Sequence, residues 1–154
     1  MSEDDNVLEQ RIRNKLDQQG IAYEAVAHEP VYTNPAMAEA LGVDEAATVK
    51  SLVLMTRTGD MIVFVLPGDM KAEWKRVSNA AGSRVSFADK DEVARRVGCE
   101  VGCVPPFGHM EDLPVYMHPD VKELEFMYFN PGVHDMSYKV GTKDLINMCN
   151  PTFI

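Results

Sequence analysis

Lys50 stands out because it is a charged residue in an otherwise apolar stretch. The run Val49 to Thr56 is rich in β-branched and aliphatic residues, which is typical of a strand. Lysine can lay its stem along such a strand while its ammonium reaches water at the edge of the sheet. It can also serve as a fixed cation beside an anionic or carbonyl oxygen. The residue type alone leaves both interpretations open.

A stiff loop is the second candidate for chemistry. In Gly102-Cys103-Val104-Pro105-Pro106-Phe107-Gly108 two prolines restrict the backbone, and the glycines at both ends let it approach another group closely. Such a loop can present backbone N–H groups to a carbonyl oxygen. A rigid turn without any function has the same composition, so this alternative also stays open.

The third candidate is the turn Asn130-Pro131-Gly132-Val133-His134, which lies between two predicted strands. A histidine in such a turn is by default a surface side chain. Together with Lys50 and the stiff loop, however, His134 becomes a candidate for orienting a substrate or carrying a proton.

Several other kinds of site are not indicated. The sequence lacks the phosphate-binding patterns G-x-x-x-x-G-K-[ST] and G-x-G-x-x-G, and it lacks the G-x-S-x-G pattern of serine hydrolases. The four histidines and three cysteines do not have the paired spacing of metal ligands. We therefore expect no metal, no other cofactor, and free thiols at Cys99, Cys103 and Cys149.

Size and charge narrow the class of protein. The chain has 154 residues, 45% of them apolar, and a formal net charge of -9, so we expect one domain over residues 1–154. The acidic balance argues against a DNA partner and limits any contact with RNA to local patches. No apolar run approaches the roughly 20 residues of a membrane span, and the acidic start carries no secretory signal. We expect no membrane association and a cytoplasmic location.

Apolar periodicity and capping residues predict alternating helices and strands. Helices are expected from about Leu8 to Gly20, over 35–41, from Asp69 to Gly82, over 89–98 and from Thr142 onward. Strands are expected over 21–27, 49–56, 61–66, 114–117, 124–129 and 136–140, with a hairpin turn at 57–60. Strands interleaved with short helices favour a mixed α/β fold.

The helix expected after Asp69 has two different faces. Asp69 is its predicted N-cap, and Lys71 and Lys75 form a basic stripe on its outer side. The residues predicted to face the core are Met70, Trp74, Val77 and Ala81.

Five short motifs occur in order along the chain. They are His28-x-Pro30, Val49-Lys50-Ser51-Leu52-Val53, Leu66-Pro67-Gly68-Asp69, Gly102-x-x-x-Pro106-Phe107-Gly108 and Asn130-x-Gly132-x-His134. Taken together they resemble the YbaK-type family of aminoacyl-tRNA editing proteins, which is similar to the insertion domain of bacterial-type prolyl-tRNA synthetase. The likeness extends from about His28 to the last helix.

The resemblance implies a central, mixed, largely antiparallel curved sheet surrounded by short helices. It also implies hydrolysis, without a metal, of the ester that joins a wrong amino acid to tRNA, with the 3'-terminal aminoacyl-adenosine held in a pocket. A tRNA for proline that carries a small or polar amino acid is the expected substrate, and an aminoacyl-tRNA synthetase is an expected further partner. Contacts with the acceptor end are expected first at Lys50, Lys71, Lys75 and Arg76, because phosphate contacts need local positive charge.

The same resemblance assigns site residues. Lys50 matches the functional lysine of the family, and His134 in its pocket-lining turn is the second catalytic candidate. The implied substrate-binding residues are His28, Gly102, Cys103, Val104, Pro106, Phe107 and Gly132. We expect Lys50, the stiff loop and the turn with His134 to converge on one cavity sized for an aminoacyl group.

Ester hydrolysis fits such a set of residues. A positioned water and donors aimed at the developing oxyanion suffice, so no side-chain nucleophile is required. We expect the hydroxyl or thiol of the substrate to assist as a base, which agrees with the lack of a clear protein base.

Two residues depart from the family pattern. Cys103 lies where many relatives carry a second glycine, and His118 lies near a position where relatives often carry aspartate. Both departures affect the expected amino-acid preference and activity. Two alternatives therefore stay open: a noncatalytic binding or regulatory module on the same fold, and a hydrolase for another small ester or thioester.

Overall fold

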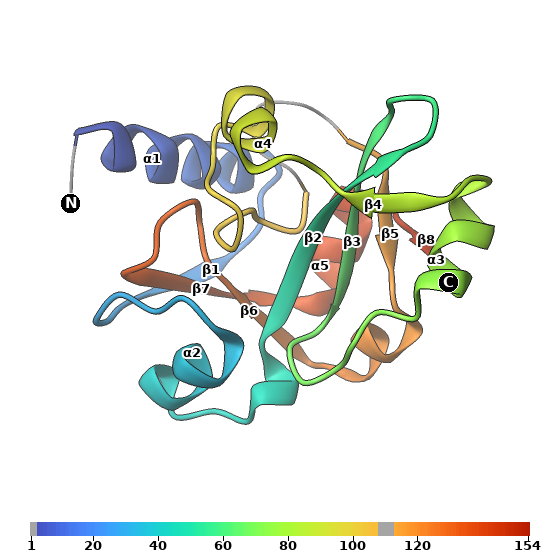
Figure 1. Cartoon of the computed structure of the whole chain (residues 1–154). Helices are drawn as coiled ribbons and strands as arrows, with labels where there is room; N and C mark the ends of the chain where they lie inside the picture. The colour runs from blue at the N-terminus through green and yellow to red at the C-terminus, as the bar shows by residue number, and fades with distance from the viewer. Residues whose placement is uncertain (1–2, 108–112) are drawn as a thin grey trace.

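The computed structural model describes residues 3–107 and 113–154, which form two sheets and five helices in the described part of the chain. The larger sheet has the strand order β4 (Val85–Phe87), β2 (Val49–Thr56), β3 (Met61–Pro67), β5 (Val115–Met117) and β8 (Thr152–Phe153). The smaller sheet has the order β1 (Tyr23–Ala27), β7 (Met136–Gly141) and β6 (Phe126–Phe129). Figure 1 shows how β2 and β3 run through the middle of the molecule.

The hairpin of β2 and β3 is central because its strands carry apolar side chains on both faces of the sheet. Every residue of β3 is buried. Val63 and Val65 pack in the larger apolar cluster, whereas Phe64 and its even-numbered neighbours pack in a second cluster on the other face of the sheet. A strand with cores on both faces needs apolar residues throughout, which explains its continuous apolar run.

The larger sheet is mixed and the smaller one is antiparallel. β2 is antiparallel to β3 and β4, while β5 is parallel to both β3 and β8. In the smaller sheet β7 is antiparallel to both neighbours. The two sheets meet where Thr48 and Tyr128 form a parallel β-bridge just before β2 begins.

Helix α1 (Glu3–Gln18) covers the smaller sheet. Ile12 and Leu16 are fully buried in the cluster that also holds Tyr138 of β7. The Tyr138 hydroxyl donates a hydrogen bond to Glu9, and Arg13 pairs with the same carboxylate at 2.6 Å. Burial and the bond to Glu9 raise the pKa of Tyr138, so its hydroxyl stays protonated and holds the helix to the sheet.

The remaining helices are short and have clear ends. Helix α2 (Asn34–Leu41) begins after Thr33, whose hydroxyl accepts a bond from Ala36 N, and it ends at Gly42 in the left-handed region. Helix α4 (Lys90–Val97) begins after Asp89, whose carboxylate accepts from two backbone N–H groups. Helix α5 (Thr142–Cys149) follows β7 directly. None of the described helices is long and apolar enough to cross a membrane.

Most predicted elements are confirmed, including the hairpin, the mixed α/β fold, and the helices over 35–41, over 89–98 and from Thr142. The expectation of one central sheet is wrong in detail, because the strands divide into two sheets. The short edge strands β4 and β8 were not predicted, since two or three residues carry no clear periodicity.

The helix predicted to start at Asp69 is the clearest error. Helix α3 spans Trp74–Ala81, and Trp74 is 40% exposed instead of facing the core. The physical reason lies just upstream. Gly68 N donates to Thr48 O at 2.7 Å and Met70 N donates to Pro67 O at 3.1 Å, so this segment turns against the start of β2 and delays the helix.

Candidate active site

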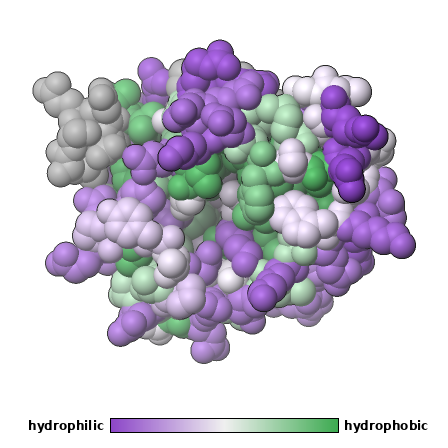
Figure 2. Space-filling model, in the orientation of Figure 1, coloured by the Kyte–Doolittle hydropathy of each residue, from purple (hydrophilic) through white to green (hydrophobic). Residues whose placement is uncertain are grey.

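A cavity of about 310 Å³ lies beside β2. Its walls are residues 32–34 with Met37, residues 49–53, Phe87, Ala88 and Lys90, loop residues 101, 102 and 104, and Phe129 with Asn130. Both sheets therefore contribute to it. Figure 2 shows apolar side chains gathered around a recess in the middle of this face, with hydrophilic side chains around them. A small, mainly apolar cavity with a few polar groups is the usual form of a ligand site.

The register of the hairpin decides which backbone groups of β2 reach this cavity. Gly68 N donates to Thr48 O at 2.7 Å, and Thr56 N donates to Asp60 O at 2.9 Å. Alternate residues of an antiparallel strand direct their N–H and C=O groups to opposite edges. The even-numbered residues of β2 therefore bond to β3, and the odd-numbered ones face the other edge.

At that other edge β2 is partly open. β4 pairs only with residues 54–56, and one further bond joins Ala88 N to Val53 O at 3.0 Å. Ser51, which lines the cavity, is the next odd-numbered residue, and its N–H and C=O have no backbone partner among the described residues. An N–H and a carbonyl of an edge strand are strong hydrogen-bonding groups that a ligand can use. The hydroxyl of Ser51 adds a third polar group at the same place.

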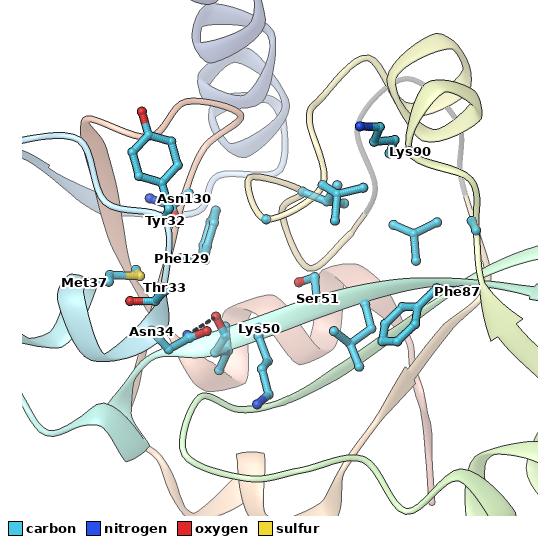
Figure 3. A pocket seen from close by; sticks show the side chains of 17 residues that line it. Tyr32, Thr33, Asn34, Met37, Lys50, Ser51, Phe87, Lys90, Phe129 and Asn130 are labelled. Atoms are coloured by element: carbon cyan, nitrogen blue, oxygen red, sulfur yellow. Dashed lines mark hydrogen bonds between the residues drawn. The ribbon is translucent and has the colours of Figure 1, made fainter.

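The side chains of Lys50 and Ser51 extend from opposite faces of β2, as Figure 3 shows. Lys50 is half-buried and lines the cavity, and its Nζ donates to Gly68 O at 3.4 Å. This bond is long and leaves two of the three ammonium hydrogens for other acceptors. Lys50 is therefore a cation at the cavity wall and is held by a weak backbone contact.

Asn34 and Gly68 fix the end of β2 that carries Lys50. Asn34 donates from Nδ2 to Thr48 Oγ1 at 3.0 Å and to Val49 O at 3.3 Å, which ties the start of α2 to β2. A Cβ on Gly68 would lie 2.7 Å from Asn34 Nδ2 and 2.9 Å from Glu45 O. Only glycine fits there, so the carbonyl that holds Lys50 is positioned by close packing.

The loop of residues 101–104 forms the wall opposite Ser51. Gly102 has a φ of +96°, which favours glycine, and an added Cβ would meet no atom within 4 Å. Gly102 and Val104 line the cavity, whereas Cys103 between them is directed to the other side of the loop. The loop thus separates two hollows.

The second hollow, of about 420 Å³, holds His134. His134 Nδ1 lies 3.1 Å from Val31 O, so this nitrogen must carry a proton and donate it. His134 Nε2 lies 3.0 Å from Cys103 Sγ and 2.9 Å from Glu100 Oε2. A neutral ring accepts from the thiol, and a protonated ring donates to the carboxylate. Both nitrogens are therefore engaged by groups of the chain itself.

The expected convergence on a single cavity is correct only in part. Lys50, Gly102, Val104 and Asn130 of the turn line the first cavity, but Cys103, Gly132 and His134 line the second. The reason is that Gly132 N donates to Cys103 O at 3.1 Å, which places the turn behind the loop.

Tyr32 is the residue that lines both hollows. Tyr32 is 73% exposed, and the centroid of its ring lies 4.5 Å from that of the His134 ring.

Gly132 is required by packing as well as by conformation. Its φ is +82°, and an added Cβ would lie 3.2 Å from Ile12 Cδ1 and 3.5 Å from Cys99 Sγ. The turn is therefore pressed against α1 and the loop. This explains the glycine in the motif without a contact to a ligand.

Three other predicted substrate-binding residues lie away from the Lys50 cavity. His28 bonds to Ser137 Oγ and Glu29 O, each at 2.7 Å, and so joins β1 to β7. Pro106 and Phe107 are buried, and the Phe107 ring packs edge-on against Phe129 at 6.2 Å. None of the three is among the residues that line the cavity. Gly108 of the same motif lies outside the described residues.

Several lining residues were missed by sequence reasoning. Ser51 had a usable signal, because it is a second polar residue in an apolar strand next to Lys50. Asn34 was interpreted only as part of a helix start. Tyr32, Phe87 and Lys90 gave no local signal, since their place at the cavity depends on contacts between distant segments.

Cys99 and Cys149 are not suited to act as nucleophiles. Burial raises the pKa of Cys99 and of Cys149 to about 12 in each case, so both are protonated at neutral pH. Cys103 is buried and bonded to His134. Among the described residues no group of three or more His, Cys, Asp or Glu side chains is placed to hold a metal ion.

The chain is similar to known proteins over most of its length. The family model described as aminoacyl-tRNA editing domain matches residues 28–148. The multifunctional Ser/Thr-tRNA deacylase ProXp-y of Escherichia coli strain K12 is 28% identical over 154 residues, which cover 97% of this chain and 92% of that protein.

Two further similarities concern synthetases. A proline–tRNA ligase of Trichlorobacter lovleyi is 31% identical over 103 residues, which cover 66% of this chain and 18% of that protein. The crystal structure of a proposed trans-editing enzyme for prolyl tRNA synthetase has the same fold, with a TM-score of 0.88, 22% identity, and coverage of 100% of this chain and 96% of that one.

Proposed function

Because the chain belongs to the aminoacyl-tRNA editing domain family, as the five motifs indicated, we propose that it is a free-standing deacylase that hydrolyses the ester of a mischarged tRNA. The similarity to a Ser/Thr-tRNA deacylase over nearly the whole length of both proteins supports this activity. It also supports a small, polar amino acid as the group that is removed. A tRNA for proline is one tRNA that would carry this wrong amino acid.

One observation carries the proposal. Ser51, at the open edge of β2, and Lys50, whose side chain extends from the other face of that strand, both line the cavity of about 310 Å³. Among the described residues, the N–H and the carbonyl of Ser51 have no backbone partner, and the hydroxyl of Ser51 and the cation of Lys50 belong to the same lining, which is otherwise mainly apolar. Such a set can hold an aminoacyl ester and stabilise negative charge on its carbonyl oxygen.

The reaction needs no protein nucleophile. A water adds to the ester carbonyl carbon and gives a tetrahedral intermediate, whose oxyanion is stabilised by N–H donors and the ammonium. The bond from this carbon to the ribose oxygen then breaks, and the ribose hydroxyl leaves with a proton. The proton of the attacking water is accepted by a group of the substrate or by the solvent. The products are the free amino acid and the uncharged tRNA.

The cavity takes the 3'-terminal aminoacyl-adenosine in this proposal. The polar groups at Ser51 bind the aminoacyl part, and Lys50 lies beside the ester or the terminal phosphate. His134 is not assigned to the reacting atoms, because both ring nitrogens are engaged on the far side of the loop. We assign His134 and Gly132 a positioning role through Cys103.

A synthetase is the second partner in this proposal. The matched segment in the proline–tRNA ligase makes up 18% of that enzyme, so a related domain occurs next to a charging site. A separate chain has to reach the tRNA after its release or in contact with the synthetase.

The test is a deacylation assay with tRNAs charged with serine, threonine, alanine or cysteine. The wild type should hydrolyse at least one of them, and Lys50→Ala should lose most of this activity. Lys143→Ala is the matched control, because Lys143 is an exposed lysine on α5 outside the cavity lining. Survival of every aminoacyl-tRNA at the uncatalysed rate would contradict the proposal. Hydrolysis of free amino-acid esters alone would indicate a different small ester as substrate.

A further inference from the structure

We propose that Trp74 and Phe87, together with the basic side chains around them, form a stacking platform for the unpaired nucleotides that precede the terminal nucleoside of a tRNA. This inference rests on the proposed function, because it follows the same RNA strand out of the cavity. The platform is defined as Trp74, Phe87, Lys71, Lys75, Arg76 and Lys90.

The two aromatic rings are unusually exposed and contact each other. Trp74 is 40% exposed and Phe87 is 62% exposed, and their centroids are 5.1 Å apart with nearly perpendicular planes. Exposed apolar side chains that adjoin one another can mark a site of interaction. Two free aromatic faces suit nucleobases, because every base has a flat face that stacks on an aromatic ring.

The rings adjoin the mouth of the Lys50 cavity. Phe87 and Lys90 are both among the residues that line this cavity. Phe87 ends β4, which is an edge strand of the larger sheet, so the ring has open space on one side. An RNA strand whose terminal nucleoside enters the cavity passes Phe87 on its way out and then reaches Trp74.

Charge separates this region from the rest of the chain. Residues 71–90 carry five basic and two acidic side chains, a net charge of +3, whereas the whole chain has a net charge of -9. The acidic residues Asp69, Asp91 and Glu92 flank this segment, so the positive charge is local to it. The five basic residues, Lys71, Lys75, Arg76, Arg84 and Lys90, are all exposed. This is the local positive patch that an acidic protein needs in order to bind a phosphate backbone.

In the part of the chain that the structure describes, none of these five cations makes an ion pair with an acidic side chain. Elsewhere cations are placed over rings, as with Lys139 over Phe126 at 4.2 Å and Lys122 over Phe153 at 3.9 Å. No such contact covers Trp74 or Phe87 within residues 3–107 and 113–154. Rings and cations are therefore both available to a ligand that carries bases and phosphates.

The first experiment uses fluorescence, because Trp74 is the only tryptophan in the sequence. A four-nucleotide RNA that ends in CCA should quench its emission in a saturable way, and salt should weaken the binding. Lys75→Glu should weaken the binding roughly tenfold, since it replaces a phosphate contact by a repulsive charge. Lys143→Glu should leave it unchanged. Quenching by polyglutamate but not by the RNA would overturn the proposal and indicate an acidic protein partner. Equal quenching by a blunt RNA duplex would also overturn it.

The second experiment separates the platform from the reaction. Trp74→Ala and Lys75→Glu should each raise the KM for a mischarged tRNA roughly tenfold. Both variants should hydrolyse the matching aminoacyl-adenosine, which lacks the preceding nucleotides, at the wild-type rate. Equal losses on both substrates would overturn the platform. If the wild type hydrolyses neither substrate, the proposed function fails, while the fluorescence titration still decides whether the platform binds RNA.

Discussion

The two hollows on either side of loop 101–104 both contain polar groups but differ in what those groups bond to. In the cavity beside β2, the backbone of Ser51 has no partner from the described chain and Lys50 has one long bond. In the second hollow, His134 is bonded at both ring nitrogens. We infer that the first hollow is built to bind a ligand and the second to hold the loop.

The two hollows differ in how much hydrogen-bonding capacity is left for a ligand. A histidine beside a cysteine and a glutamate attracts attention as a catalytic group, but its bonds are already satisfied. At the strand edge, the N–H and the carbonyl of Ser51 have no backbone partner within residues 3–107 and 113–154, so both can still bond to a ligand. Available hydrogen bonds, and not the residue type alone, distinguish the two hollows.

The largest expected difference between the hollows concerns Lys50. Lys50→Met keeps the stem but removes the charge, and it should lower kcat/KM for the mischarged tRNA by about 100-fold. The midpoint of thermal unfolding should hardly change, because the lost bond to Gly68 O is long. Deacylation kinetics and a thermal melt of the same preparation provide the measurement. Full activity in Lys50→Met would contradict the inference that the first hollow binds the ligand and the second only holds the loop.

The next prediction compares two glycines with positive φ. Gly132→Ala should lower the free energy of unfolding by about 2–3 kcal/mol, because its Cβ would press on Ile12 and Cys99. Gly102→Ala should cost only about 1 kcal/mol, since its Cβ would meet open space. Urea unfolding of both variants measures the two values. Equal costs would mean that the turn is not held more tightly than the cavity wall.

A third prediction tests the positioning role of His134. His134→Gln should lower the free energy of unfolding by about 1–2 kcal/mol, because it disturbs bonds to Val31 O and Cys103 Sγ. The KM for tRNA and kcat should change less than in Lys50→Met. Glu100→Gln is the control: its side chain is 78% exposed, so its loss should have almost no effect on stability. A loss of activity in His134→Gln as large as in Lys50→Met, without any loss of stability, would assign His134 to the reaction.

The effect expected to be smallest at neutral pH is that of the ionisation of the Cys99 thiol, which lines the second hollow. Burial raises its pKa from 9.0 to about 12, so folding favours the protonated thiol. This contribution to stability is complete below pH 9 and is lost as the pH rises from 9 toward 12. In Cys99→Ala the fall in unfolding free energy over this range should be shallower by up to about 1.4 kcal/mol per pH unit. Comparing slopes, and not absolute stabilities, cancels the cost of the smaller side chain. Identical slopes would mean that the thiol is not shielded from water.

Local patterns in the sequence were sufficient to predict most elements. The capping residues Thr33 and Asp89 mark the helices that they cap, because a cap is a contact between neighbours along the chain. The β2–β3 hairpin follows from two apolar runs and a short turn. Lys50 and the loop with Gly102 could likewise be identified as site candidates, since their settings are unusual within a few residues.

The division of the site between two hollows could not be predicted in this way. It depends on the bond from Gly132 N to Cys103 O, which joins segments about thirty residues apart and leaves no periodic signal. The open edge at Ser51 depends on where β4 stops, and a strand of three residues is too short to recognise. Trp74 was placed in the core because helical spacing was extended upstream across a turn.

The Thr48–Tyr128 bridge has a consequence for ligand binding. It lies at the seam between the two sheets, and the cavity walls on either side of that seam belong to different sheets, with residues 49–53 on one and Phe129 and Asn130 on the other. A molecule that fills the cavity therefore contacts both sheets and holds them together. When the cavity is occupied, the protein should unfold at a higher temperature, and the increase should grow with ligand concentration.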